Sequence, residues 1–369
     1  MQISNLSTPA VLLERAQVEQ NTQRMAKKAH ELGVRLRPHV KTHKCVEIAR
    51  LQVSDHFGGL TVSTFAEAKY FAAAGFRDIT LAVPVALGRI DELLDFAESM
   101  DAFHLLIDSQ IALDALESSA LQRGQQTSVY LKVDCGYGRA GVVPGTDEAI
   151  ALASHLHGSD CIEFRGLLTH GGHSYDCVNR AEIRVVAEQE RAVVVGFAEE
   201  LRARGLTFPE VSVGSTPTMC VTEDLTGVTE IRPGNYALFD RFQAVIGSCS
   251  MDEVAISVLA TVIGAYPDRI LLDCGALALS KDPGPVHVQP DGGFGLLLTI
   301  DMKPVAGLSL VGLSQEHGKA QGPGATEFNV GDRLRVVPNH SCLTMACFDQ
   351  AHIVDGPRVV DSWAPCRGW

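Results

Sequence analysis

The chain has 369 residues, of which 46% are hydrophobic and 20% are charged. These proportions are typical of a folded protein with sizeable cores, and they argue against a disordered chain. With 31 basic and 44 acidic residues the formal net charge is −13, so the chain lacks the basic surface that nucleic-acid-binding proteins use. The length favours one large domain accompanied by a smaller one.

From the pattern of the N-terminal residues we expect no export signal. The segment MQISNLSTPAVLLERAQ has no basic stretch followed by an apolar one, and no window reaches the roughly 18 apolar residues that a membrane helix needs. We therefore expect a soluble, cytoplasmic protein with no membrane partner. The 10 cysteines are scattered along the chain. In a reducing compartment we expect most of them to be small buried hydrophobic residues, with one or two used chemically.

The first two-thirds of the chain alternates short β-rich runs with amphipathic helical segments. The predicted strands are 34–40, 59–63, 79–83, 103–107, 128–134, 163–169, 210–213 and 229–232. The predicted helices between them include 65–74, 89–99, 110–123 and 180–204. Thr64 and Glu67 have the spacing of a capping box, which supports a helix that begins at residue 65. Eight strands with intervening helices predict an α/β fold, a (β/α)8 TIM barrel, although a doubly wound sheet shows a similar alternation.

After Ala244 the sequence pattern changes. The predicted strands that follow, with little helical periodicity, are 254–265, 269–272, 295–301, 308–313, 333–337 and 351–354. Turns rich in glycine and proline separate them, so this part is predicted to be a mostly antiparallel β domain. We therefore divide the chain into a barrel domain over 10–244 and a β domain over 245–369 that also includes 1–9. No flexible linker separates the two, and we expect them to pack together.

The first predicted barrel strand leads into the segment VRLRPHVKTHK, which begins at Val34. Because side chains alternate along a strand, Arg37, His39 and Lys41 face one way and the apolar residues face the other. The apolar set should meet the helices, so the basic residues should point into the barrel, whose active sites lie at the strand ends. A lysine among other cations can have a lowered pKa and a reactive neutral amine. The alternation of side chains does not by itself exclude the alternative that this segment is a surface loop rich in basic residues.

The loops after the seventh and eighth predicted strands lie where barrels often bind phosphate. They read GSTPT, over 214–218, and RPGNY, over 232–236. Small hydroxyl side chains in the first loop and Gly234 in the second favour a phosphate-bearing ligand. The polar side chains that follow the fifth and sixth strands at the same rim are Arg139, His170, His173 and Tyr175. A lysine, an anion site, ring-stacking side chains and an arginine together suit pyridoxal 5'-phosphate.

These segments together resemble a known family. The blocks that carry the resemblance, in chain order, are TPAVLLE, RPHVKTHK, KVDCGYGRAGV, THGGHSY, GSTPT, EIRPGNY, DCGALALSKD, SQEHG and PNHSC. They span nearly the whole chain and are similar to those of D-serine dehydratases, D-threonine aldolases and D-hydroxyaspartate lyases. These are pyridoxal-phosphate enzymes of the alanine-racemase-like fold type III. The resemblance implies that Lys41, rather than Lys44, carries the cofactor as a Schiff base.

The same resemblance implies further contacts with the cofactor. The residues that it places at the phosphate group are Thr216, Gly234 and Asn235. Tyr175 resembles the tyrosine near cofactor and substrate, and His170 the histidine that lies against the ring. Arg139 resembles the arginine near the phenolate or ring edge. Arg232 matches the arginine that faces the pyridine nitrogen in alanine racemases.

The segment PNHSC contains His340 and Cys342, two residues apart, directly after the predicted strand 333–337. A second pair with the same spacing, His43 and Cys45, shows that the bare pattern is weak evidence. Imidazole and thiolate are favourable zinc ligands, and two protein ligands leave positions open for water or substrate. In the resembling family the corresponding residues bind a divalent metal. We therefore predict zinc at His340 and Cys342, and we assign the other pair to the helix after the first barrel strand.

Two reactions share these parts. A dehydratase removes the α-proton, with the Lys41 amine as base, and expels the β-hydroxyl, whose departure a Lewis acid assists. An aldolase instead deprotonates the β-hydroxyl and breaks the Cα–Cβ bond. The family pattern has cysteine at the second metal position in dehydratases and aspartate in aldolases, so Cys342 favours dehydration. Leu168 stands where eukaryotic D-serine dehydratases have tyrosine, which leaves the substrate open among D-serine, D-threonine and D-3-hydroxyaspartate.

An amino-acid racemase is a weaker alternative. It needs a second base across the cofactor, usually a tyrosine from the partner subunit, and Tyr266 is the only tyrosine clearly in the β domain. The metal pair would also be unexplained. The resemblance further implies a homodimer with active sites near the interface. We expect a lyase that removes water and then ammonia from a small D-3-hydroxy amino acid to give a 2-keto acid.

Overall fold

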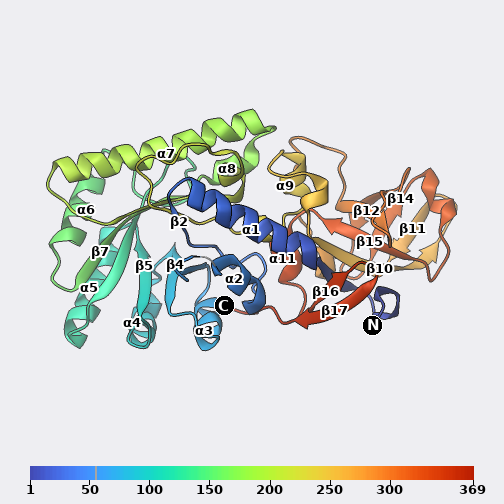
Figure 1. Cartoon of the computed structure of the whole chain (residues 1–369), viewed down its shortest axis with the longest axis horizontal. Coiled ribbons are helices and arrows are strands. Elements are labelled where there is room, and N and C mark those ends of the chain that lie inside the picture. Colours follow the sequence, from blue (N-terminus) through green and yellow to red (C-terminus); the bar gives the residue numbers. More distant parts are fainter. Residues whose placement is uncertain (55) are drawn as a thin grey trace.

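The computed structural model (Figure 1) describes residues 1–54 and 56–369. Eight parallel strands form one sheet in the order β2-β9-β8-β7-β6-β5-β4-β3. From β2 to β9 they span Arg35–Leu36, Leu60–Val62, Asp78–Pro84, Ala102–Ile107, Thr127–Lys132, Ile162–Leu168, Glu210–Val213 and Glu230–Ile231. Beyond β2, Val40 N donates to the Thr61 carbonyl at 3.0 Å, and His39 forms a parallel bridge with Thr61 of β3. The sheet therefore closes into the predicted barrel, and the doubly wound alternative is wrong.

Helices surround the barrel strands (Figure 1). Those of the barrel half, α1 to α9, span Arg15–Glu31, Val46–Val53, Phe65–Ala73, Ile90–Ala97, Gln110–Arg123, Asp147–Gly158, Arg180–Ala203, Thr216–Val221 and Arg241–Val245. The predicted capping box is confirmed at α3, where Thr64 Oγ1 accepts from Glu67 N at 3.2 Å and the Glu67 carboxylate accepts from Thr64 N at 3.3 Å. Short 3-10 turns span Ile3–Asn5, Leu87–Arg89, Gly172–Asp176, Asn235–Ala237, Met251–Glu253 and Pro323–Glu327.

A second, nine-stranded sheet forms the other half of the molecule, at the right of Figure 1. Its strands β1 and β10 to β17 span Ala10–Glu14, Ile256–Ala265, Arg269–Leu272, Gly295–Thr299, Ser309–Leu313, Gly318–Gln321, Arg333–Pro338, Ala351–Asp355 and Arg358–Trp363. Two short helices, α10 and α11, span Ala276–Leu279 and Ser341–Met345. All pairings between these strands are antiparallel except that of β1 with β16. The predicted, mostly antiparallel β domain is thereby confirmed.

Strands β1, β14 and β17 were not among the predicted ones. The apolar run of β1 leads directly into α1 without a turn signal, so in the sequence it merges with the helical pattern. β14 reads GKAQ and offers no apolar alternation. The hydrogen bonds of β1 are made with β10 and β16. Residues 10–14, which our division assigned to the barrel domain, therefore pair with the second sheet.

The parity predicted for the first barrel strand is confirmed. Leu36 and Val40 are fully buried in the apolar layer between barrel and helices. Arg37 points the opposite way and is also fully buried. Its guanidinium donates to Glu230 at 2.7 Å and to Asp78, which neutralises the charge inside the barrel. His39 and Lys41, which continue the same alternation, line a cavity together with residues that follow other barrel strands.

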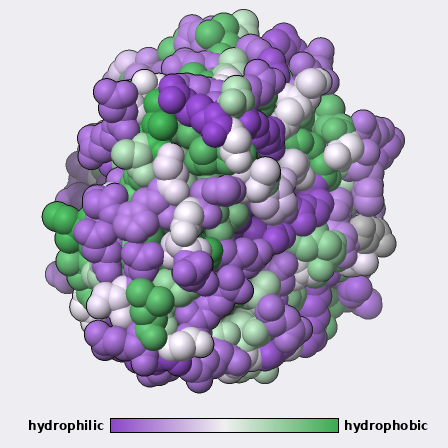
Figure 2. Space-filling view, turned by 90° about the vertical axis from the view of Figure 1, so that its left-hand side faces the viewer, coloured by the Kyte–Doolittle hydropathy of each residue, from purple (hydrophilic) through white to green (hydrophobic). Residues whose placement is uncertain are grey.

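The barrel end of the molecule has a mostly hydrophilic surface with separate hydrophobic spots (Figure 2). Helix α4 shows why: its apolar residues Leu93 and Leu94 are buried, while Asp91 and Glu92 face solvent. No helix within 1–54 and 56–369 is long and apolar enough to cross a membrane.

Candidate active site

A cavity of about 410 Å³ lies at the carboxyl ends of the barrel strands, and β-domain side chains form part of its wall. The predicted site residues all line this cavity: Lys41, Arg139, His170, Tyr175, Thr216, Arg232, Gly234, Asn235, His340 and Cys342. They come from six separate segments of the chain, five of which the barrel topology brings to one rim. Sequence reasoning missed three other lining residues, Thr42, Lys132 and Tyr137.

Lys41 follows β2 and lines the cavity. Its backbone N–H donates to His39 Nδ1 at 3.4 Å, and the other ring nitrogen of His39 lies 3.2 Å from Ser63 Oγ. Burial, together with the charges of Lys41 and Arg232, holds the pKa of His39 well below its usual value. The imidazole is therefore neutral, with Nδ1 accepting and Nε2 donating. By contrast, Lys44 forms an ion pair with Glu67 and does not line the cavity.

The two loops predicted to hold phosphate are joined to each other. Tyr236 N donates to Thr216 Oγ1 at 3.1 Å, so the loop after β8 is tied to the loop after β9. Asn235 Nδ2 donates to Asp240 Oδ2 at 2.7 Å, which fixes the orientation of that amide. A Cβ atom at Gly234 would lie only 2.5 Å from the His39 carbonyl. The glycine is therefore required by close packing on the segment after β2, a reason that the sequence alone does not reveal.

The remaining barrel side chains form a cationic wall. Arg232 is buried and donates to Ser212 Oγ and to the Thr169 carbonyl. Arg139 lies over the ring of Tyr137, with 5.1 Å from its guanidinium carbon to the ring centroid. Burial, and then the charges of Lys41 and Lys132, lower the pKa of His170 well below its usual value. Its Nδ1 lies 3.4 Å from the Gly214 carbonyl, so this neutral ring donates there and its Nε2 carries no proton.

Lys132 ends strand β6 and is only 6% exposed. Burial, and then the charge of Arg232, lower the pKa of this lysine to about 7. The available signal was a lysine inside the apolar run SVYLKV, because such a residue at a strand end points toward the barrel rim. Lys132 therefore adds a second amine to the cavity that Lys41 occupies.

Tyr175, in the 3-10 turn after β7, lines the cavity near Cys342. Its ring packs on Phe242 with a centroid separation of 5.7 Å. Burial, and then the neighbouring Cys342 and Asp240, raise the pKa of its phenol well above the usual value. Tyr175 therefore keeps its proton and can donate a hydrogen bond within the cavity.

The predicted metal ligands lie at the start of α11, on the β-domain side. His340 Nδ1 is 2.9 Å from Asp282 Oδ2, and His340 also forms a side-chain hydrogen bond with Cys342. Burial works against charge on both groups, but each raises the ionisation of the other: the pKa of His340 is raised and that of Cys342 lowered. Without a metal the pair is therefore an imidazolium and a thiolate, and a metal that binds both side chains would replace the imidazolium proton. Within 1–54 and 56–369 no group of three potential ligands is arranged to hold a metal.

The donor set fits both predicted groups. Four cations of the barrel wall, Lys41, Lys132, Arg139 and Arg232, form no ion pair with any described carboxylate. A doubly charged phosphate and a phenolate would supply the missing negative charge. For zinc, a thiolate and an imidazole whose other nitrogen is held by a carboxylate are a suitable partial ligand set with positions left for water or substrate.

Comparisons with known proteins agree with this architecture. A family model for the alanine racemase N-terminal domain matches residues 13–241, and one for a serine dehydratase domain matches residues 255–354. D-threo-3-hydroxyaspartate dehydratase from Delftia sp. (strain HT23) is 39% identical, over 99% of this chain and 98% of its own. The chain belongs to the family of D-serine dehydratases and D-threonine aldolases.

Both branches of this family are represented among the relatives. D-threonine aldolase from Arthrobacter sp. is 30% identical over 98% of this chain and 92% of its own. A solved structure of a mutant D-threo-3-hydroxyaspartate dehydratase in the metal-free form matches with a TM-score of 0.94 at 36% identity, covering 100% of both chains. The barrel and the β domain therefore occur together in the family as they do here.

Proposed function

We propose that this chain is a lyase that depends on pyridoxal 5'-phosphate and zinc and removes water, then ammonia, from a D-3-hydroxy amino acid. The product is a 2-keto acid. Retro-aldol cleavage to glycine and an aldehyde is the second candidate, since relatives of both kinds match the chain. Cys342 favours the first, because soft thiolate ligation distinguishes the dehydratase pattern from the aspartate of the aldolases.

One contact supports the proposal above all others. Cys342 Sγ lies 3.2 Å from the hydroxyl of Thr42, the residue directly after Lys41. A metal on Cys342 and an amine on Lys41 would therefore be close enough to act on neighbouring atoms of the same small substrate. Elimination of water needs this arrangement, because the proton leaves the α-carbon and the hydroxyl leaves the adjacent β-carbon.

When bound, the cofactor would withdraw electrons from the α-carbon and zinc would act as a Lewis acid on the β-hydroxyl. Lys41 would hold the cofactor and receive the α-proton. Tyr175, which keeps its phenol proton, would donate a hydrogen bond to the substrate. The residues that would position the cofactor are Thr216, Gly234 and Asn235 at the phosphate, His170 at the ring face, Arg139 at the phenolate edge and Arg232 at the pyridine nitrogen.

The proposed setting is a cytoplasmic homodimer. The support for the compartment is that all 10 cysteines are free, as expected in a reducing environment. The support for the dimer is the family resemblance. Sedimentation equilibrium of the holoenzyme tests it directly, since a single species at the mass of one chain would contradict the dimer.

Product analysis tests the reaction. Holoenzyme is incubated with D-serine, D-threonine and D-3-hydroxyaspartate, and 2-keto acid, ammonia and aldehyde are measured separately. We expect equal amounts of keto acid and ammonia, and no turnover of L-serine. Glycine with a stoichiometric aldehyde would assign the chain to the aldolases instead. Turnover of L-serine at the same rate as D-serine would contradict the proposed specificity.

A further inference from the structure

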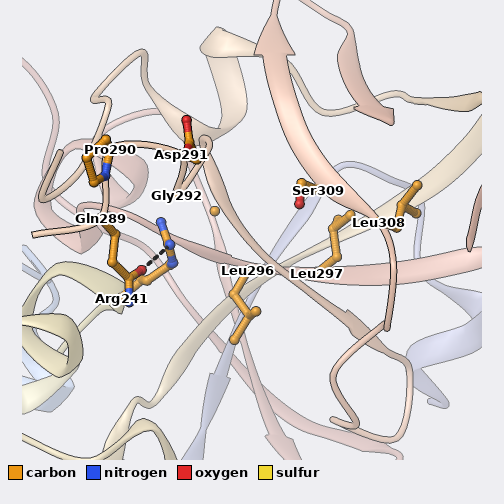
Figure 3. A pocket seen from close by; sticks show the side chains of 10 residues that line it. Arg241, Gln289, Pro290, Asp291, Gly292, Leu296, Leu297, Leu308 and Ser309 are labelled. Carbon is orange, nitrogen blue, oxygen red and sulfur yellow. Dashed lines mark hydrogen bonds between the residues drawn. The ribbon is translucent and has the colours of Figure 1, made fainter. Parts of the chain in front are cut away.

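A second cavity, of about 420 Å³, lies in the β domain outside the active site (Figure 3). Arg241, the first residue of α9, lines its inner end, and the segment 289–292 forms one side. The apolar part of its wall comes from Leu296 and Leu297 of β12, together with Leu308. None of these residues lines the active-site cavity.

Arg241 is the feature that needs explanation. Its side chain is only 7% exposed, yet within 1–54 and 56–369 no carboxylate forms an ion pair with it. Nη1 donates to Asn339 Oδ1 at 2.9 Å and Nη2 donates to Gln289 Oε1 at 2.7 Å. Both partners are neutral amides, and the guanidinium has five N–H donors. The two bonds use two of these five donors, and the guanidinium lines the cavity with its full positive charge.

Burying a guanidinium without a negative partner is unfavourable in free energy, and a bound anion would offset this. A buried charge is ordinarily paired, and burial alone accounts for the lowered pKa of Arg241. Arginine nevertheless remains protonated in proteins, so the charge persists. Asp291 lines the same cavity, but Figure 3 shows its carboxylate pointing away from Arg241. The cavity thus holds an uncompensated cation at one end and leucine side chains at the other.

We propose that this cavity is a binding site for a small monocarboxylate with a short apolar body. The carboxylate would take the free donors of Arg241, in the forked geometry that a guanidinium offers, and the apolar body would lie against Leu296, Leu297 and Leu308. A single cation matches one negative charge. The nearby Asp291 opposes a doubly charged anion such as phosphate. The ligand is therefore an organic acid and not a phosphate ester.

The site is connected to the metal-binding turn through one side chain. Asn339, which accepts from Arg241, also donates through Nδ2 to the Asp282 carbonyl at 3.1 Å and to the Gly293 carbonyl at 2.9 Å. Asn339 directly precedes His340, and Asp282 contacts His340. An acid bound at Arg241 would therefore hold the two segments that carry the metal site. The proposal itself concerns binding alone and does not depend on the reaction catalysed.

Calorimetric titration of the holoenzyme with isobutyrate tests the site, with neutral isobutyramide as the matched control ligand. The visible absorption of the cofactor, recorded in parallel, separates binding in the active cavity from binding elsewhere. We expect isobutyrate to bind without changing that absorption, and isobutyramide to bind at least about tenfold more weakly, because the charge-assisted hydrogen bonds are lost.

Two variants locate the binding. Arg241→Gln should weaken isobutyrate binding at least about tenfold, by the loss of a charged donor pair. Ser309→Glu introduces a negative charge at an exposed lining position and should do the same without removing Arg241. Arg269→Gln, which removes one positive charge from the surface of the same domain, should leave binding unchanged. Unaltered binding in the folded Ser309→Glu variant, or equal binding of isobutyramide by the parent, would overturn the proposal.

Discussion

The two walls of the active cavity differ in whether their charged side chains have partners of opposite charge. The barrel wall presents Lys41 and Lys132 with two arginines and no described ion-pair partner. The β-domain wall carries its own compensation: His340 contacts Asp282 on one side and Cys342 on the other. The first wall is complementary to an anion and the second to a cation. Two groups of opposite charge can therefore be bound side by side, and each should be removable without the other.

Removal of Lys41 should have the largest effect. Lys41→Ala deletes the amine that would hold the cofactor and receive the α-proton, so turnover of D-3-hydroxy amino acids should fall at least about 10³-fold. The visible absorption of the purified protein should disappear, while bound zinc, measured by metal analysis, should remain. Lys44→Ala is the matched control, since Lys44 pairs with Glu67 outside the cavity. Loss of the absorption in that variant, with its retention in Lys41→Ala, would reverse the assignment.

Removal of the predicted metal ligands should have the reverse effect, with loss of zinc and retention of the cofactor. His340→Ala and Cys342→Ala should lose zinc and reduce elimination from D-serine at least about 100-fold, because the Lewis acid contributes several kcal/mol. The cofactor absorption should stay. With D-3-chloroalanine as the substrate, the two variants should lose less activity, because chloride is a better leaving group than hydroxide and needs less help from a Lewis acid. Cys45→Ala is the matched control, since it removes a cysteine of the other His-x-Cys pair. This variant should bind zinc as the parent does. Unfolding or cofactor loss on chelation would mean that the metal is structural.

Asp282 should affect the zinc affinity through its contact with His340, without being a metal ligand itself. Because it holds Nδ1 of His340, the other ring nitrogen is available to Cys342 and to the proposed zinc. Asp282→Asn removes the charge at constant size, and it should weaken zinc affinity about 10- to 100-fold. Competition with a chromogenic chelator measures this affinity. Asp301→Asn, at an exposed position of the same domain, should bind zinc as the parent does; an equal loss there would indicate a general charge effect.

The sequence identified the positions of the cavity but not the contacts between them. Alternation along 34–41 was sufficient to direct Arg37 and Lys41 inward, because parity follows from local geometry alone. The two His-x-Cys pairs show the limit. His43 is fully buried with one ring nitrogen 2.9 Å from Gln52, whereas His340 faces the cavity. The spacing of histidine and cysteine is the same in both pairs. What differs is their surroundings: Gln52 contacts His43, and Asp282, distant in the sequence, contacts His340.

The same limit explains other contacts that could not be predicted from the sequence. Asp282 is 58 positions from His340 in the chain, and no local pattern connects them. Gly234 was assigned to close approach of a ligand, while its nearest contact is the His39 carbonyl. Strand β14, with four residues and no alternation, exists because β11 and β13 pair on either side of it. Tertiary contacts determined each of these features.

The smallest expected effect concerns the charge of the barrel wall itself. Burial lowers the pKa of Lys132 to about 7, whereas a lysine in the unfolded chain titrates near 10.4. Between these values the unfolded chain binds a proton that the folded apoprotein does not, so stability rises with pH across this window. The contribution is complete above the unfolded pKa and is lost as the pH falls toward about 7. Its slope is at most about 1.4 kcal/mol per pH unit.

Chemical denaturation of the apoprotein between pH 7 and pH 10 measures this slope. Lys132→Met should flatten the profile relative to the parent, while Lys303→Met, at an exposed position, should follow the parent. An anionic cofactor bound beside Lys132 favours its charged form and raises its pKa, so the holoenzyme should lose most of the same slope. Identical profiles for apoprotein and holoenzyme, in a parent that differs from Lys132→Met, would place the cofactor's negative charge away from Lys132. The complementarity of the two walls would then have to rest on Arg139 and Arg232 alone.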